Sequence, residues 1–225
     1  MAGIPQLGAE IDFVNGPAFV AVAFTLNDPY KGVLGKGQLA EGDDLVDISS
    51  IILRASVRRG RNRILNKFEA GTAVVEIKDD NGDWNPANTA GPYYGKLVPL
   101  RKIRIFADYE GIRYYLFSGF ITSYDTQFAI GADEVSKVIL NCVDGFRLLN
   151  NVAISTVADT GAGQLSGTRI EKLLDASNWP NSQRVIDAGN STMQADPGTA
   201  DRTVLGAIQT VEDSEFGGFF MAAEG

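Results

Sequence analysis

The sequence predicts a mainly β protein: an antiparallel barrel or sandwich, followed by a smaller α+β part. Apolar and polar side chains alternate with a period of two in several short segments of the first 150 residues, which is typical of half-buried strands. Turn-forming Gly, Asn and Asp residues separate these segments, and strands at such short spacing favour antiparallel pairing over βαβ units. Beyond about residue 150 the apolar residues recur at helical spacing instead.

A chain of 225 residues is long enough for one large or two small domains. We expect an N-terminal strand and loop, or arm, in residues 1–45, a β domain in residues 46–150, and an α+β segment in residues 151–225 that begins a second domain. The composition also changes at the second boundary. Residues 151–225 hold 4 basic and 10 acidic residues, against 16 and 18 in residues 1–150.

The first strands are predicted by an apolar run and by alternation. Residues 18–26 form an apolar run that fits a strand buried on both faces. Residues 51–58 and 73–78 alternate apolar with mostly polar side chains, and a slip of one residue in the first of these would bury two arginines. The residues expected to face the core are Ile51, Leu53, Ala55 and Val57, with Arg54 and Arg58 opposite.

Residues 102–109 and 112–124 are predicted to form a β-hairpin. Both segments are rich in alternating apolar residues, and Glu110-Gly111 is left as a two-residue connection between them. Glycine reaches the positive φ that such tight turns need. Residues 135–143 then close the series of strands.

Helices are predicted in three places. Residues 144–149 form a short helical turn, and residues 168–177 form a helix that stops at Trp179-Pro180. Residues 202–213 form a second longer helix, with Asp201 as its N-cap.

The end of the sequence predicts another strand. Residues 215–222 are expected to be extended, and Glu224-Gly225 resembles the first half of a hairpin turn. Because a domain rarely stops in mid-hairpin, we expect either that the chain continues past residue 225 or that another element completes the sheet edge.

The composition excludes several kinds of catalyst. The chain has no His and one Cys, so it cannot hold a Ser-His-Asp or Cys-His catalytic group, a His-ligated zinc or an internal disulfide. Residues 79–83 resemble a calcium loop, but Gly82 comes too early and Asn88 stands where a Glu is needed. We therefore expect a turn there, and a protein that is not an enzyme and needs no cofactor or metal. The apolar run is too short to span a membrane, so no stable membrane insertion is expected.

One basic cluster stands out on a chain of net charge −8. Its arginines could bind phosphate or an acidic protein surface, or could simply keep a loop between two strands soluble. The acidic balance argues against tight binding of nucleic acid, and no aromatic residues interleave the cluster for stacking on bases. The cluster comprises Arg58, Arg59, Arg61 and Arg63.

A series of short motifs is more specific than the composition. In order they are RGR (59–61), FEAGTA (68–73), DDNGDWNPAN (79–88), GPYY (91–94), PLRKIR (99–104), LFSGFI (116–121) and DGFRLL (144–149). In this order and spacing the region 48–150 resembles minor tail proteins of long-tailed bacteriophages, the class at the tail tip. Gly91 stands where Ser is usual, and Asn85 stands where Asp is common.

The resemblance implies a tail-tube-like β-barrel that joins copies of itself into a ring, typically a trimeric hub, at the distal end of the virion tail. Implied partners are the distal tail, tail tube, tape-measure and other tail-tip proteins, with transient passage of genomic DNA. The ring would extend the tail tube and connect it to the host-recognition apparatus. The candidate subunit-contact residues are Arg58, Arg59, Arg61, Arg63, Tyr93 and Tyr94.

Three alternatives stay open at this point. A distal tail protein would also be structural but would form a hexameric ring, and a second barrel encoded after residue 225 would favour the hub. A module that binds the cell surface or carbohydrate would use exposed aromatic residues to bind sugar. A wall-degrading tail hydrolase would need a catalytic domain, which this sequence does not predict.

Overall fold

The computed structural model describes residues 3–13, 45–62, 67–130, 134–198, 201–215 and 217–223. They form two compact units: unit 1 comprises Met1–Val57 and Ala73–Cys142, and unit 2 comprises Arg58–Thr72 and Val143–Ala223. The predicted strand at residues 18–26 lies outside the described residues. The domain boundaries predicted after residues 45 and 150 stay predictions.

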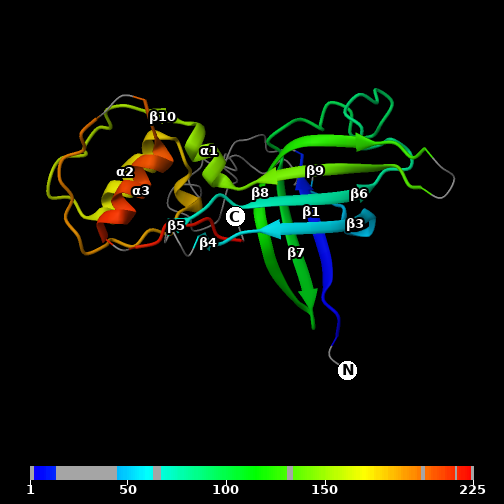
Figure 1. Ribbon diagram of the computed structural model, residues 1–225, viewed down its shortest axis with the longest axis horizontal. Helices are drawn as coiled ribbons and strands as arrows, with labels where there is room; N and C mark the ends of the chain where they lie inside the picture. The colour runs from blue at the N-terminus through cyan, green and yellow to red at the C-terminus, as the bar shows by residue number, and fades with distance from the viewer. Residues whose placement is uncertain are drawn as a thin grey trace, which may run out of the picture. The chain divides into compact units, whose positions relative to one another are not determined.

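Unit 1 is built on one seven-stranded sheet in the order β2-β1-β7-β8-β9-β6-β3 (Figure 1). A 3-10 helix, Ser49–Ile51, follows β2 and leads directly into β3, so the two end strands of the sheet are neighbours along the chain and the sheet curls back toward itself. This confirms a mainly β fold with a small helical part. The strands are β1 (Gln6–Asp12), β2 (Leu45–Asp47), β3 (Ile52–Arg58), β6 (Thr72–Lys78), β7 (Lys102–Tyr109), β8 (Ile112–Gln127) and β9 (Lys137–Val143).

The curled sheet encloses a single apolar core. Alternate residues of β6 are almost fully buried while their neighbours are not, as the period of two predicts, and β9 repeats the pattern. Burying one such aliphatic side chain stabilises the fold by about 1.5–3 kcal/mol. The core residues include Ala9, Ile11, Ile48, Ala73, Val75, Ile77, Ile103, Ile105, Phe117, Ile121, Val138, Leu140 and Cys142.

The prediction for residues 51–58 is right in part. Ile51, Ala55 and Val57 pack against the core, and Arg54 and Arg58 are exposed. Leu53 is 47% exposed, so its predicted core position is wrong. Among the described residues β3 is the last strand of the sheet, so no further strand covers its outer margin. At its start, where the 3-10 helix ends, Ile51 and Ile52 both pack against the core.

The predicted hairpin between β7 and β8 is confirmed. Tyr109 pairs with Ile112, and the two connecting residues, Glu110 and Gly111, have φ angles of 51° and 80°, as a type I′ turn requires. The sequence did not predict the β-bulge next to Ile105, where the register shifts and Leu116 becomes an extra residue on β8.

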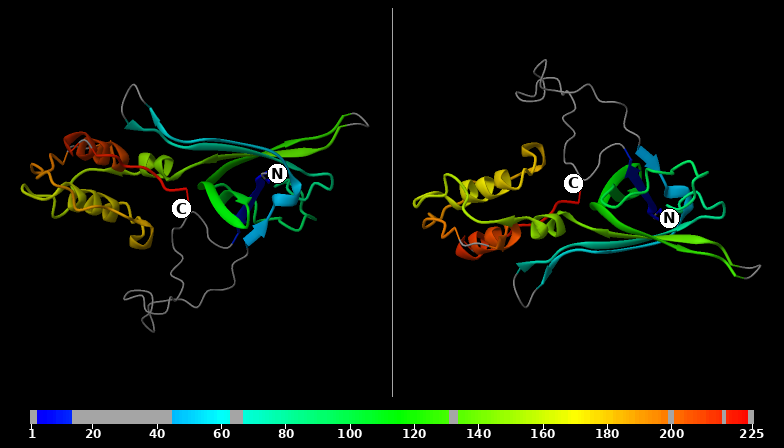
Figure 2. Two further views of the ribbon diagram at one scale, coloured as in Figure 1. Left: turned by 90° about the horizontal axis from the view of Figure 1, so that it is seen from below. Right: turned by 90° about the horizontal axis from the view of Figure 1, so that it is seen from above.

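Unit 2 contains three helices and two short pairs of strands. Helices α2 and α3 lie side by side (Figure 2), and their buried apolar residues include Leu173, Leu174, Val204 and Ile208. The elements are β4 (Arg61–Asn62), β5 (Lys67–Phe68), α1 (Gly145–Asn151), β10 (Ala153–Ile154), α2 (Ser166–Ala176), the 3-10 helix Asn181–Gln183, β11 (Arg202–Thr203) and α3 (Val204–Glu215). β4 pairs with β5, and β10 pairs with β11.

The three predicted helices are present, with one wrong cap. Asp144 caps α1 by accepting a hydrogen bond from the Phe146 N–H at 3.0 Å. Asp201 was expected to cap α3, but Thr203 does so, because its Oγ1 accepts from the Gly206 N–H at 3.1 Å. Asp201 lies two residues further back with a φ of 61°.

The strand predicted at residues 215–222 is absent among the described residues of that segment. Glu215 is the last residue of α3, and residues 217–223 have no strand. Aromatic contacts hold this stretch instead. Between ring centroids, Phe219 stacks on Phe146 at 5.6 Å, and Phe220 lies tilted against Phe68 at 5.2 Å. Within the described residues, no helix has the length and apolar character needed to cross a membrane.

Candidate functional site

The predicted subunit-contact residues are divided between the two units. Tyr93 and Tyr94 belong to unit 1, whereas the arginines from Arg58 onward belong to unit 2. The backbone of Arg61 is described but its side chain is not, and Arg63 lies outside the described residues. A role of these residues in subunit contact stays a prediction.

The basic segment folds as a short hairpin. Arg61 pairs with Phe68 across β4 and β5, and the Glu69 N–H donates to the Gly60 carbonyl at 3.3 Å. Gly60 has a φ of 137°, a conformation open to glycine.

The two arginines whose side chains are described differ in their surroundings. The Arg58 side chain is 86% exposed and lies 3.9 Å from Glu69, an ion pair that contributes little in water. The Arg59 guanidinium donates a hydrogen bond to the Met221 carbonyl, 162 residues away in sequence. Arg59 is exposed but tied to a distant segment of unit 2, whereas Arg58 is exposed and has only a loose ion pair.

A buried carboxylate joins the hairpin segment to α1. The Asp144 carboxylate accepts from the Gly71 N–H at 2.6 Å and from the Phe146 N–H at 3.0 Å, while the Asp144 N–H donates to the Gly71 carbonyl at 3.0 Å. Burial raises the pKa of Asp144, and the two N–H donors and Arg59 oppose that rise. A Cβ on Gly71 would lie 2.8 Å from an Asp144 oxygen, so the residue at position 71 must be small.

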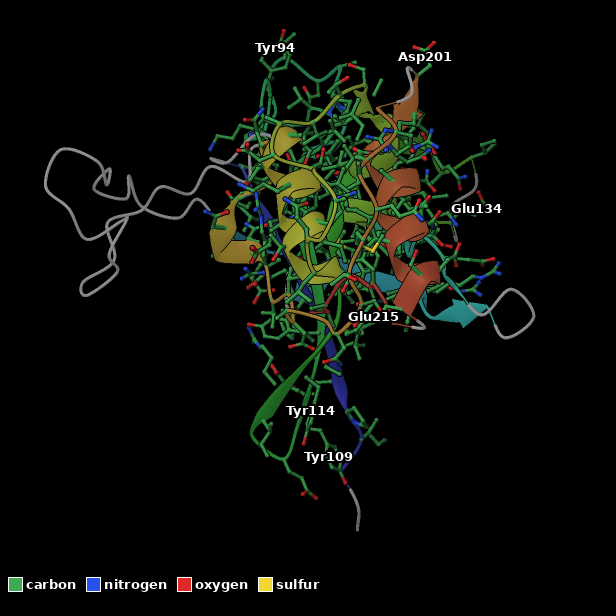
Figure 3. The ribbon with its side chains drawn as sticks, turned by 90° about the vertical axis from the view of Figure 1, so that its left-hand side faces the viewer. Tyr94, Tyr109, Tyr114, Glu134, Asp201 and Glu215 are labelled. Atoms are coloured by element: carbon green, nitrogen blue, oxygen red, sulfur yellow. The ribbon has the colours of Figure 1, made fainter. Side chains whose placement is uncertain are left out.

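In unit 1 the turns that follow β6 fold over an aromatic cluster. The Asp79 carboxylate accepts a hydrogen bond from the Trp84 N–H at 3.2 Å. This confirms the turn predicted for residues 79–83, the segment whose sequence resembles a calcium loop. The Tyr93 ring lies 4.5 Å from the ring of Trp84 and 5.3 Å from that of Phe13. Tyr93 thus packs within the unit, whereas Tyr94 is 54% exposed. Figure 3 shows Tyr94 at the outer end of its loop.

The described residues offer little for chemistry. No group of three or more Cys, Asp and Glu side chains that could hold a metal ion occurs among them. Cys142 is buried, and burial raises the pKa of its thiol, so it stays protonated and unreactive.

Sequence reasoning missed the polar network of unit 2. Arg169 is 4% exposed, and its guanidinium donates to the carbonyls of Thr160, Gly161 and Gln194 at 2.8–3.1 Å. Glu215, at the end of α3, accepts from Ser166 and from the Asn190 N–H. These partners are distant in sequence and belong to irregular loops, so no periodicity or motif in the sequence predicts these contacts.

Comparison with known proteins gives structural neighbours only. No family model matches the sequence, and no curated protein matches it. The structure is similar to the tail protein from Neisseria meningitidis MC58, with 15% identity and a TM-score of 0.40 over 71% of this chain and 44% of that chain. It is also similar to the 43 kDa tail protein of prophage MuSo2 from Shewanella oneidensis, with 11% identity and a TM-score of 0.35 over 72% and 49%. The chain thus spans less than half the length of these two proteins.

Proposed function

We propose that this chain is a structural protein of the bacteriophage tail tip. It forms a ring, or hub, that extends the tail tube and connects it to the host-recognition apparatus. In this role it binds copies of itself together with distal tail, tail tube, tape-measure and other tail-tip proteins, and genomic DNA passes through the ring without being held.

One observation carries the proposal. Two of the motifs that resemble tail-tip proteins, FEAGTA and DGFRLL, are joined by hydrogen bonds between Gly71 and Asp144, 73 residues apart. A third motif, DDNGDWNPAN, supplies the turn that places Trp84 in the core of unit 1. The motif residues therefore have structural roles. Because the motifs contact one another or the core, their order along the chain reflects a connected fold and is not a chance series of short matches.

The charge of the chain agrees with a conduit. A net charge of −8 disfavours lasting contact with DNA phosphates, and a ring through which DNA passes must not retain it. Arg58, with its exposed side chain, is available to an acidic surface on a neighbouring protein. Such rim contacts set register more than affinity.

Quantitative mass spectrometry of purified phage particles that encode this chain tests the proposal. We expect the chain in the tail fraction at a fixed ratio to the tail tube protein, with the copy number of a trimer. The copy number of a hexamer would support the alternative, a distal tail protein. Absence of the chain from the particle would contradict both.

A further inference from the structure

The inner face of the sheet in unit 1 continues beyond the core. The register aligns Ala9, Ile105 and Phe117 across β1, β7 and β8, and all three are buried. The next row on the same face, toward the turn, aligns Leu7 with Ala107 and Tyr114. Side chains of one parity share a face on β1 and β7. On β8 the extra residue of the β-bulge, Leu116, shifts the parity by one, so this second row extends the core face.

The extended part of this face is apolar and partly exposed. Leu7 is 39% exposed, Tyr114 is 49% exposed and Ile112, next to the turn, is 55% exposed. Figure 3 shows Tyr109 and Tyr114 on the part of the hairpin that projects from the rest of unit 1. We name this surface the ribbon face, and it comprises Leu7, Ala107, Tyr109, Ile112 and Tyr114.

The opposite face of the same strands is polar and internally paired. The Arg113 guanidinium lies 3.0 Å from the Asp108 carboxylate and 3.9 Å from Glu10, and it covers the Phe106 ring at 3.6 Å. Gly8 makes room for that ring, since a Cβ there would lie 2.3 Å from it. The hairpin is therefore amphipathic, and ion pairs between its strands stabilise its polar face.

We propose that the ribbon face binds a second copy of this chain. Two copies that each carry a net charge of −8 repel one another, so they associate most easily through surfaces without unpaired charge. The ribbon face holds no charged residue, and the charges of Glu10 and Asp108 behind it are paired with Arg104 and Arg113.

The size of the ribbon face fits such a contact. Leu7, Ile112 and Tyr114 are 39%, 55% and 49% exposed, and Tyr109 is partly buried. Taking about 150–250 Å² for an aromatic side chain as an upper guide for each, the patch offers roughly 300–400 Å². That is close to half of the roughly 800 Å² that one partner contributes to an interface of standard size. The ribbon face can form the apolar centre of an interface whose rim is polar.

This inference deepens the proposed function and rests on it for the choice of partner, because a ring requires a contact between copies.

Charge placed on the ribbon face tests the inference. In sedimentation velocity of the full chain, we expect the wild type to assemble with increasing concentration. The double variant Ile112→Glu, Tyr114→Glu should need at least about tenfold higher concentration, because burying an unpaired carboxylate is costly. The matched control is Val185→Glu in unit 2, where the side chain is 98% exposed, and it should assemble like the wild type.

Circular dichroism and thermal unfolding confirm that each variant is folded, and Leu7→Glu replaces the double variant if that variant unfolds. A folded ribbon variant that assembles like the wild type would overturn the inference. So would a wild-type chain that stays monomeric at every concentration, or a ribbon variant that loses only its binding to another tail protein.

Failure of the inference is distinguishable from failure of the proposed function. If the chain is a component of purified tails and the ribbon variant is incorporated normally, the inference fails and the proposed function stands. If the chain is absent from phage particles but self-associates through the ribbon face, the proposed function fails and the inference stands.

Discussion

At the residue scale, the contact between Gly71 and Asp144 links two segments that are far apart in sequence. The carboxylate is buried and accepts two backbone N–H groups, a geometry that stabilises the charged form against the cost of burial. The Asp144 carboxylate can occupy this position because residue 71 is glycine and has no Cβ.

Replacing Gly71 with Ala should destabilise the protein by about 1–3 kcal/mol, because the new Cβ would meet an Asp144 oxygen at 2.8 Å and disrupt a buried hydrogen bond. Denaturant unfolding measures the loss. Gly217→Ala is the matched control, since nothing lies within 4 Å of a Cβ built there. Equal unfolding free energies for the two variants would contradict the role of the contact.

Acid should weaken the ion pair between Asp196 and Arg202. Hydrogen bonding to Arg202 lowers the pKa of Asp196 below its ordinary value of 3.8, so the pair stabilises the folded state above that pH and the contribution is lost as the pH falls through the folded pKa. Asp196→Asn should lower the melting temperature at neutral pH. The gap between variant and wild type should close below pH 3.8, and a gap that is constant with pH would disprove the assignment.

At the element scale, the sequence predicted those strands and turns whose contacts are made with residues nearby in the sequence. The alternation of β6 and the Glu110-Gly111 turn were both predicted from neighbouring residues. Leu53 was misplaced because nothing local to its sequence says that β3 ends the sheet. The Arg169 network and the ribbon face were missed for the same reason: each depends on which distant segments meet.

The contrast between a central strand and an edge strand gives a direct test. Ile105→Ala on β7 should cost about 2–5 kcal/mol of unfolding free energy, because the side chain is fully buried and its removal leaves a cavity. Leu53→Ala on β3 removes a similar aliphatic side chain that is 47% exposed, and should cost less than about 1.5 kcal/mol. Comparable losses would mean that the edge position of β3 is wrong.

At the scale of the whole molecule, Arg58 and Arg59 should behave differently in assembly. Arg58→Ser should leave the unfolding free energy almost unchanged and weaken assembly at low salt, with a difference that shrinks as salt screens the contact. Arg59→Ser removes the hydrogen bond to Met221 and should lower the stability of unit 2. Light scattering across a salt series measures the first effect. A difference between Arg58→Ser and wild type that does not change with salt would exclude a charge contact there.

We propose that copies of this chain form a ring at the distal end of a phage tail. Electron cryo-microscopy of intact particles that encode the chain tests it most directly, because the curled seven-stranded sheet of unit 1 can be located in the density. We predict a ring of these sheets around the tail axis below the tail tube, with the ribbon face buried between copies. A reconstruction in which the chain lies elsewhere in the particle, or occurs as single copies without a ring, would contradict the claim.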